Sequence, residues 1–377
     1  MDDRWSGMGA TGGPAGASGP AGAGQAPGPG FGPPGSGPGF GQPGFGPPHP
    51  FAPPEPPGRA PRRHTGAYIT SGVLLIGFAC VLGAWIVHAA SNATVDVDWL
   101  LESLVKNDPT LPLMVFTAHE WAFTLALLVV GIATLTLRRT ARGAALLLAF
   151  LLLGVGARQI NGLTRSDYRD HMFATEHGTL ILLTYMFAFL AAITVIILML
   201  VARERDVPPE PASGGRRAAG VLLILIGAVQ GYWYARGMRQ LNQYIGDENG
   251  GRGAFTEWWR EVLNVNALGG YGISAGFAYY PSVLIAAFLV VGVLLLCNAP
   301  AARGAALALL GIAGYLQLRD LAGIEYGRLA DHYRDSITGW SLTCSFAVGA
   351  AMLVAVVLVR RTARPYVPPR YPPSPLP

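Results

Sequence analysis

Long runs of apolar residues alternate with short polar segments along most of the chain. Eight of these runs are about 20 residues long, the length that an α-helix needs to cross the hydrocarbon core of a bilayer. They lie near residues 67–90, 113–137, 144–161, 178–202, 218–240, 274–297, 304–322 and 337–359. The pattern predicts an all-α, polytopic integral membrane protein with eight transmembrane helices and both termini on the same side.

The segment before the first apolar run has a different composition. Residues 1–66 contain 19 of the 50 glycines and 16 of the 30 prolines, and such a segment cannot bury enough apolar surface to offset its ordering entropy. We expect a disordered cytosolic tail, with no secretory signal peptide ahead of the first span. Its proline clusters suit either a cytosolic partner that binds polyproline II segments or a plain tether. A second Pro-rich cytosolic tail is expected at 365–377.

Comparison of the chain with itself predicts a tandem duplication. Gly72–Ile76 aligns with Gly220–Ile224 at an offset of 148 residues, and Ala141–Leu146 aligns with Ala302–Leu307 at an offset of 161. The second offset also relates three pairs further along: Arg158 and Arg319, Asp170 and Asp331, and His171 and His332. These ordered matches predict two homologous halves.

The halves are expected to span 67–205 and 217–364, joined by a cytosolic linker at 206–216. Each half contains four spans, an even number, so both insert in the same orientation about a pseudo-twofold axis along the membrane normal. Between the first two spans of each half, 99–105 and 255–263 have the pattern of short amphipathic helices, either on the outer membrane surface or capping the bundle.

Composition and charge agree with this topology. Only 13% of residues are charged, 51% are hydrophobic and the mean hydropathy is +0.38, which argues against a soluble globular enzyme. With both termini inside, the inner segments carry +10 and the outer segments −5, which together give the net +5 of the chain. The positive-inside rule is therefore satisfied, and the basic balance predicts no nucleic-acid partner. Since 26 of the 27 basic residues are Arg, we expect a GC-rich bacterial source and a plasma-membrane location.

Candidate chemistry gathers in the predicted outer layer. At 1.5 Å per residue, Arg158 and Arg319 lie about 24 Å from the inner arginines of their spans, in a hydrocarbon core about 30 Å thick. Other polar residues are expected at a similar level. The candidate ligand-binding residues of an outward-facing vestibule are Arg158, Arg319, Arg236, Asp170, His171, Asp331, His332, His119, Glu120, Glu176 and His177.

Two interpretations of these residues stay open. Arg158 and Arg319 either pair with Asp170 and Asp331 to hold each half together, or bind an anionic or polar ligand in a shared vestibule. The offset of 161 places Tyr280-Pro281 opposite His119-Glu120, an asymmetry that fits either a specialised site or simple drift.

No motif identifies a reaction. The His and Glu residue types suit zinc or iron, but no HExxH or CxxC spacing occurs, and there is no Gly-rich phosphate loop or nucleophile elbow. We predict no metal site and no cofactor. The leading hypothesis is a non-enzymatic membrane protein with an outward-facing polar site, acting in binding, sensing or as an envelope accessory. The alternatives are a permease or channel for a small solute, and a membrane-embedded metal or haem enzyme.

Overall fold

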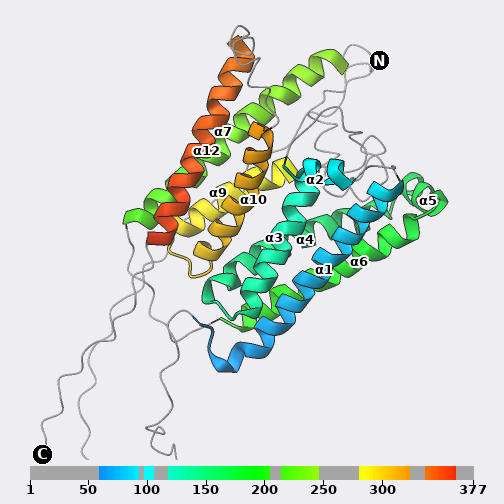
Figure 1. Cartoon of the computed structure of the whole chain (residues 1–377), viewed down its shortest axis with the longest axis horizontal. Helices are drawn as coiled ribbons and strands as arrows, with labels where there is room; N and C mark the ends of the chain where they lie inside the picture. Colours follow the sequence, from blue (N-terminus) through cyan, green and yellow to red (C-terminus); the bar gives the residue numbers. More distant parts are fainter. Residues whose placement is uncertain are drawn as a thin grey trace, which may run out of the picture. The chain divides into compact units, whose positions relative to one another are not determined.

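The computed structural model describes six stretches of the chain: residues 59–92, 97–105, 118–203, 214–245, 280–322 and 336–361. Within these stretches every regular element is a helix, apart from one isolated antiparallel bridge between Arg59 and Arg138. The helices are arranged as Figure 1 shows. The predicted all-α class is confirmed for this part of the chain.

Each of the eight predicted apolar runs contains a helix. The bounds are α1 (Thr65–Asn92), α3 (Ala118–Leu135), α4 (Arg139–Gly162), α6 (Gly178–Val201), α7 (Gly214–Ile245), α9 (Tyr280–Leu296), α10 (Ala302–Ala322) and α12 (Ser336–Arg361). Shorter helices in the described stretches are η1 (Arg62–His64), α2 (Val97–Val105) and α5 (Ser166–Ala174).

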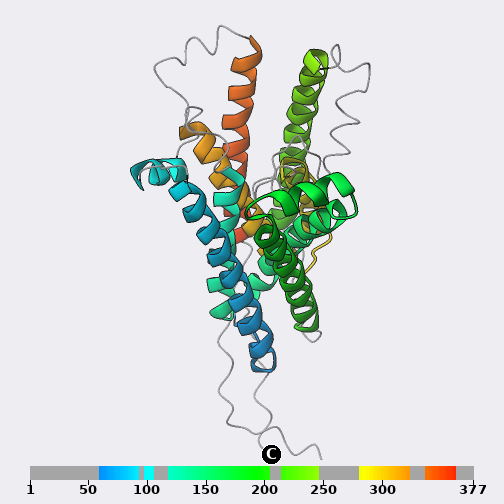
Figure 2. The same cartoon turned by 90° about the vertical axis from the view of Figure 1, so that its right-hand side faces the viewer.

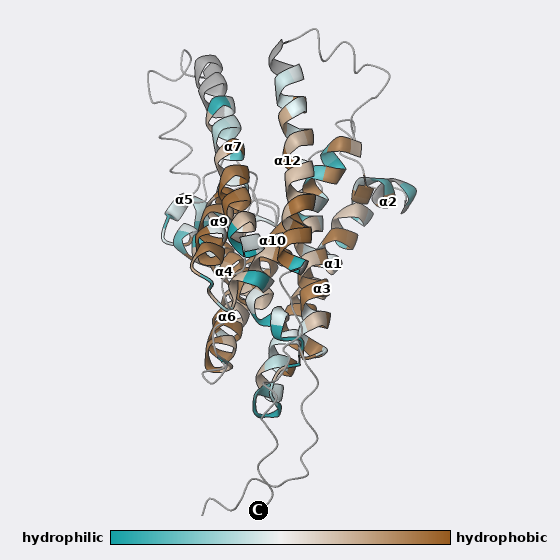
Figure 3. Ribbon diagram, turned by 90° about the vertical axis from the view of Figure 1, so that its left-hand side faces the viewer, coloured by the Kyte–Doolittle hydropathy of each residue, from teal (hydrophilic) through white to brown (hydrophobic). Residues whose placement is uncertain are grey.

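Six of the described helices are long and apolar enough to cross a membrane: α1, α4, α6, α7, α10 and α12. The other two, α3 and α9, are shorter apolar helices. Large apolar side chains on these helices point away from the protein interior, as at Val87, Leu190 and Leu353, and α6 and α9 are hydrophobic along most of their length (Figure 3). Exposed apolar surface of this kind belongs in lipid, so the chain is a multi-pass membrane protein.

Two helices begin slightly before the boundaries predicted for the tail and the linker. The N-terminal tail was expected to continue to Gly66, while Ala60 is hydrogen-bonded to the α3–α4 turn and α1 begins at Thr65. The linker was expected to continue to residue 216, yet α7 begins at Gly214. Both places contain arginines and are polar by composition. Residues 59–60 nevertheless bond to the α3–α4 turn, and residues 214–216 belong to α7. Residues 1–58, the C-terminal tail and the predicted surface helix at 255–263 lie outside the described stretches.

Helices α3 and α9 end in the same kind of turn. Leu137 and Asn298 have φ values of 57° and 54°, the left-handed conformation that often closes a helix. After α3 the Arg138 N–H donates to the Ala133 carbonyl, and after α9 the Ala299 N–H donates to the Leu294 carbonyl. These bonds satisfy carbonyl groups at the helix ends, and each turn leads directly into the next helix.

Glycines bring pairs of helices close together. Helix α1 lies beside α3 (Figures 1 and 2), and α7 contacts α9. A Cβ added at Gly72 would lie 2.9 Å from the Gly131 carbonyl oxygen, and one added at Gly220 would lie 2.8 Å from that of Gly292. Small residues permit this close backbone approach, which favours helix association in lipid.

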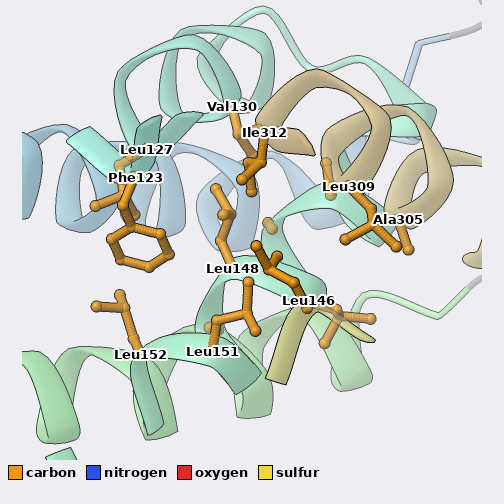
Figure 4. Close-up of a cluster of buried hydrophobic side chains, with 14 of the residues drawn as sticks. Phe123, Leu127, Val130, Leu146, Leu148, Leu151, Leu152, Ala305, Leu309 and Ile312 are labelled. Atoms are coloured by element: carbon orange, nitrogen blue, oxygen red, sulfur yellow. The ribbon is translucent and has the colours of Figure 1, made fainter. Parts of the chain in front are cut away.

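Among the long described helices, the closest glycine contact joins α4 to α10. A Cβ at Gly143 would lie 1.9 Å from the Ala301 carbonyl oxygen, and a Cβ at Gly304 would lie 1.9 Å from the Thr140 carbonyl oxygen. The apolar core continues from this crossing, with Leu148 and Leu309 fully buried. Figure 4 shows the side chains that fill it: Phe123, Leu127, Val130, Leu146, Leu148, Leu151, Leu152, Ala305, Leu309 and Ile312.

Replacing Gly143 or Gly304 with Ala should destabilise the protein, because the added methyl group collides with backbone that cannot move without separating α4 from α10. We expect the thermal unfolding midpoint in detergent to fall by roughly 5 °C or more. Gly311→Ala is the matched control, since nothing lies within 4 Å of a Cβ there. If the control and the two crossing variants had equal midpoints, the proposed close contact would be wrong.

Candidate functional site

Two buried charged residues meet where the first turn of α3 lies beside the last turn of α10. Glu120 is 2% exposed and Arg319 is 4% exposed, and their side chains interact electrostatically. His119, the neighbour of Glu120, also interacts with Arg319. The structure thus brings together three of the predicted site residues, and we call Glu120, His119 and Arg319 with Tyr315 the α3–α10 cluster.

Helices α2 and α9 complete the surroundings of this cluster. The Arg319 guanidinium donates a hydrogen bond to the Tyr315 hydroxyl, one turn earlier on α10. The Tyr315 hydroxyl donates in turn to the Leu104 carbonyl of α2, at 2.6 Å. The ring of His119 stacks on that of Tyr280 at the start of α9, with centroids 6.1 Å apart. Helix α2, predicted from its amphipathic pattern, therefore packs on the bundle at α10.

Arg158 has different neighbours, although it occupies the corresponding part of α4. It is buried and interacts electrostatically with Tyr168 of α5. The Tyr168 hydroxyl donates a hydrogen bond to the side-chain oxygen of Gln159, which is also buried. Burial raises the pKa of Tyr168 to about 12, and the nearby positive charge of Arg158 partly opposes this rise.

The remaining acidic candidates described in this region are exposed. The Asp170 carboxylate lies 3.8 Å from Arg169 and its side chain is 76% exposed, whereas Arg158 is buried; the pairing of Arg158 with Asp170 stays a prediction. Glu176 is exposed as well. His171 lies on α5, but its side chain is not among those described, and Asp331 and His332 lie outside the described stretches.

An aromatic group at the far end of α1 was only partly foreseen. The rings of His88 and His177 lie 4.8 Å apart and edge to face, and Trp85 contacts both. The Trp85 indole N–H donates to the Thr184 hydroxyl of α6, at 3.1 Å. His177 was a predicted site residue, while Trp85 and His88 were not. Their spacing of three residues on one helix places them on the same face, and this was the available signal.

Arg236 lies on α7 and is held by residues of its own helix. Its guanidinium lies 5.4 Å from the centroid of the Trp233 ring and donates to the Tyr232 hydroxyl at 3.4 Å. Such a cation–π contact is typical of a residue anchored near a membrane surface. The contacts resolved for Arg236 are thus separate from the α3–α10 cluster.

The α3–α10 cluster combines a cation, a carboxylate, an imidazole and a phenol in a small space. These groups can donate and accept hydrogen bonds to a polar ligand, and the guanidinium suits a carboxylate or phosphate group. In the part of the chain that the structure describes, no three His, Cys, Asp or Glu side chains gather closely enough to hold a metal ion.

Comparison with known proteins supplies no relative: no family model, no curated protein and no solved structure matches the chain. The function is therefore argued from the residues and their geometry.

The raised pKa of Tyr168 predicts a pH-dependent stability. An unfolded tyrosine ionises near pH 10, whereas folded Tyr168 keeps its proton until about pH 12. Its contribution to the free energy of unfolding is therefore complete below pH 10 and is lost as the pH rises to about 12. Thermal unfolding of the wild type and of Tyr168→Phe should differ most below pH 10, where the wild type is more stable, and the difference should shrink between pH 10 and 12. A difference that stays constant across this range would show that Tyr168 is not buried as described.

Proposed function

We propose that the chain is an eight-span protein of a bacterial plasma membrane, built from two tandem four-helix halves, with a polar ligand-binding site at the α3–α10 cluster. Its role is binding, sensing or accessory rather than catalytic. The observation that carries the proposal is the burial of both Arg319 and Glu120 where the last turn of α10 lies beside the first turn of α3.

The lengths of α3 and α9 are compatible with two further spans. They have 18 and 17 residues, or about 27 Å and 26 Å of helix, close to the thickness of the hydrocarbon core. Both pair with a long neighbour, α1 or α7, through the glycine contacts described above. Apolar helices of this length, packed beside spanning partners and exposing apolar side chains on their other sides, favour eight spans.

Equivalent contacts support the duplication. Gly72 meets Gly131 as Gly220 meets Gly292, and each pair is related by the offsets found in the sequence. The left-handed residues Leu137 and Asn298 are also 161 apart. The Arg142 guanidinium donates to the Met199 carbonyl, and that of Arg303 donates to the Arg360 carbonyl, again 161 residues later at both ends of the bond.

The α4–α10 crossing supports a pseudo-twofold relation between the halves. Gly143 contacts Ala301, while Gly304, the equivalent of Gly143, contacts Thr140, the equivalent of Ala301. Reciprocal contacts of this kind define an isologous interface. His119 and Tyr280, which stack on one another, are equivalent positions as well, and they are the pair that a twofold axis between the halves would bring together.

The distribution of charge supports an inward-facing position for both termini and for the α3–α4 and α9–α10 turns. The predicted tails would then lie in the cytosol, where a partner of the Pro-rich N-terminal segment would bind it.

This topology predicts the labelling of single cysteines in a variant without the three native cysteines. Cysteines placed at Arg138 and Ala299 should not react with a membrane-impermeant maleimide in intact cells. They should react once the reagent can reach the cytosolic face, as in permeabilised cells or inverted membrane vesicles. A cysteine at Glu176, after α5, should react in intact cells, because it lies beyond the opposite end of α4. Reaction of Arg138→Cys and Ala299→Cys from opposite sides of the membrane would contradict the parallel arrangement.

Cost and asymmetry both favour ligand binding at the α3–α10 cluster. Charged side chains within a helical membrane bundle are expensive, and they usually serve a function. The position equivalent to Glu120 is Pro281, and Arg158 interacts electrostatically with Tyr168. A purely structural pairing would not require this difference between homologous halves.

The chemistry of the cluster suggests a small solute that carries both an anionic group and hydrogen-bonding groups. Arg319 supplies the guanidinium for a carboxylate or phosphate. Glu120, His119 and Tyr315 supply the acceptor and donor groups that orient the rest of the solute.

Replacing Arg319 with Gln should weaken binding of the solute by about a factor of ten or more. The measurement is thermal unfolding of the purified protein against a panel of carboxylates, phosphates and amino acids. We expect at least one to raise the midpoint of the wild type, and the effect to fall by a factor of ten or more in Arg319→Gln and Glu120→Gln. Arg236→Gln is the matched control and should bind as the wild type does, because Arg236 is held elsewhere by Tyr232 and Trp233.

The outcomes separate the alternatives. A panel without any effect on the wild type, or equal loss in all three variants, would reject the site. Flux of the bound solute into proteoliposomes would instead identify a permease. Stoichiometric zinc, iron or haem in the purified protein would favour an enzyme.

A further inference from the structure

The segment before α1 is bound to the α3–α4 turn. The Ala60 N–H donates to the Leu137 carbonyl at 2.7 Å, and the Arg139 Nε donates to the Arg59 carbonyl at 2.7 Å. Arg59 and Arg138 form an antiparallel bridge, and Ala60 is buried. These contacts fix the start of α1 against the start of α4.

The same contacts gather basic side chains on one surface. Five exposed arginines belong to these two segments, and together we call them the arginine cluster: Arg59, Arg62, Arg63, Arg138 and Arg139. The acidic residues of the described stretches lie toward the opposite ends of the helices: Asp98, Glu102, Glu120, Asp167, Asp170, Glu176 and Asp320. The cluster is therefore a concentrated positive surface.

The second half retains the turn but not the charges. Asn298 has the backbone conformation of Leu137, yet Ala299 and Pro300 stand where the first half has Arg138 and Arg139. The positive-inside signal needs basic residues somewhere on the inner side, but it does not require Arg139 to be hydrogen-bonded to Arg59.

An exposed apolar surface begins directly beside the cluster. Ile69 and Val73 on α1, and Ile132 and Leu135 on α3, are all more than a third exposed, and α1 packs against α3. These residues lie within three helical turns of the arginines along the chain. A ligand that fits both surfaces has an anionic head and an apolar chain.

We propose that the arginine cluster binds the head groups of anionic phospholipids, with their acyl chains against α1 and α3. The cluster lies at the start of α1 and of α4, the level at which the hydrocarbon core would meet the head groups. One guanidinium group can donate two parallel hydrogen bonds to the oxygens of one phosphate group. The assignment of these lipids to the cytosolic leaflet rests on the orientation in the proposed function. The binding of lipid to the arginine cluster does not rest on that orientation.

Native mass spectrometry of the delipidated full-length protein tests this binding. The protein is titrated in detergent with phosphatidylglycerol or with phosphatidylcholine of the same acyl chains. The wild type should retain phosphatidylglycerol at least tenfold more tightly. The triple variant Arg62→Gln, Arg63→Gln, Arg138→Gln should lose about fivefold in affinity for each arginine removed, while Arg59 and Arg139 stay and keep the hydrogen bond between them.

The matched control removes the same charge elsewhere. Arg203, Arg217 and Arg360 are exposed and belong to other helix ends, so the variant with Gln at all three should bind phosphatidylglycerol as the wild type does. Equal loss in both triple variants would overturn the proposal, because net charge would then explain the binding. A wild type without preference for phosphatidylglycerol would overturn it too.

A competition with inorganic phosphate and two single variants complete the experiment. Inorganic phosphate at millimolar concentration should not displace phosphatidylglycerol; displacement would identify a soluble anion as the ligand instead. Single variants Arg62→Gln and Arg138→Gln, each with one charge removed, should each lose about fivefold and serve in place of a triple variant that fails to insert. If the triple variant loses lipid binding but still binds the solute at Arg319, the lipid site is independent of the site in the proposed function.

Discussion

The backbone contact between α4 and α10 is the constraint on which the rest of the structure depends. In lipid, helices gain little from hiding apolar surface, so close packing of small residues has to hold them together. Gly143 and Gly304 allow each helix to touch the backbone of the other. Around this crossing, α1 pairs with α3 and α7 pairs with α9 through further glycines, and α6 and α12 contact α4 and α10.

The polar clusters lie away from this crossing, at the other ends of α4 and α10. There α4 and α10 differ. Arg319 of α10 interacts electrostatically with Glu120 of α3, and its neighbour Tyr315 donates a hydrogen bond to α2, whereas Arg158 of α4 interacts with Tyr168 of α5. A shared apolar crossing with divergent polar ends is compatible with a duplicated scaffold of which one end acquired a binding role. The arginine cluster lies at the crossing end, and at the turn before α10 the residues Ala299 and Pro300 stand in place of Arg138 and Arg139.

The sequence predicts the helices well because each span is a long apolar run, and lipid requires such runs to be helical. Helix ends are less predictable. Helix α4 begins at Arg139, before the apolar run, because arginines are compatible with a first turn at the membrane surface. The amphipathic pattern located α2 correctly. The partners of side chains were not predictable: the electrostatic interaction of Glu120 with Arg319 depends on α3 packing against α10, and no local pattern encodes that packing.

The central claim is that α4 and α10 join two equivalent halves at their glycines. An experimental structure in lipid nanodiscs tests it most directly, through the rotation that superimposes α1, α3, α4 and α6 on α7, α9, α10 and α12. The account predicts a rotation near 180° about an axis along the membrane normal, with the Gly143 and Gly304 backbones in contact beside that axis. An axis in the membrane plane, or halves separated at α4 and α10, would contradict it.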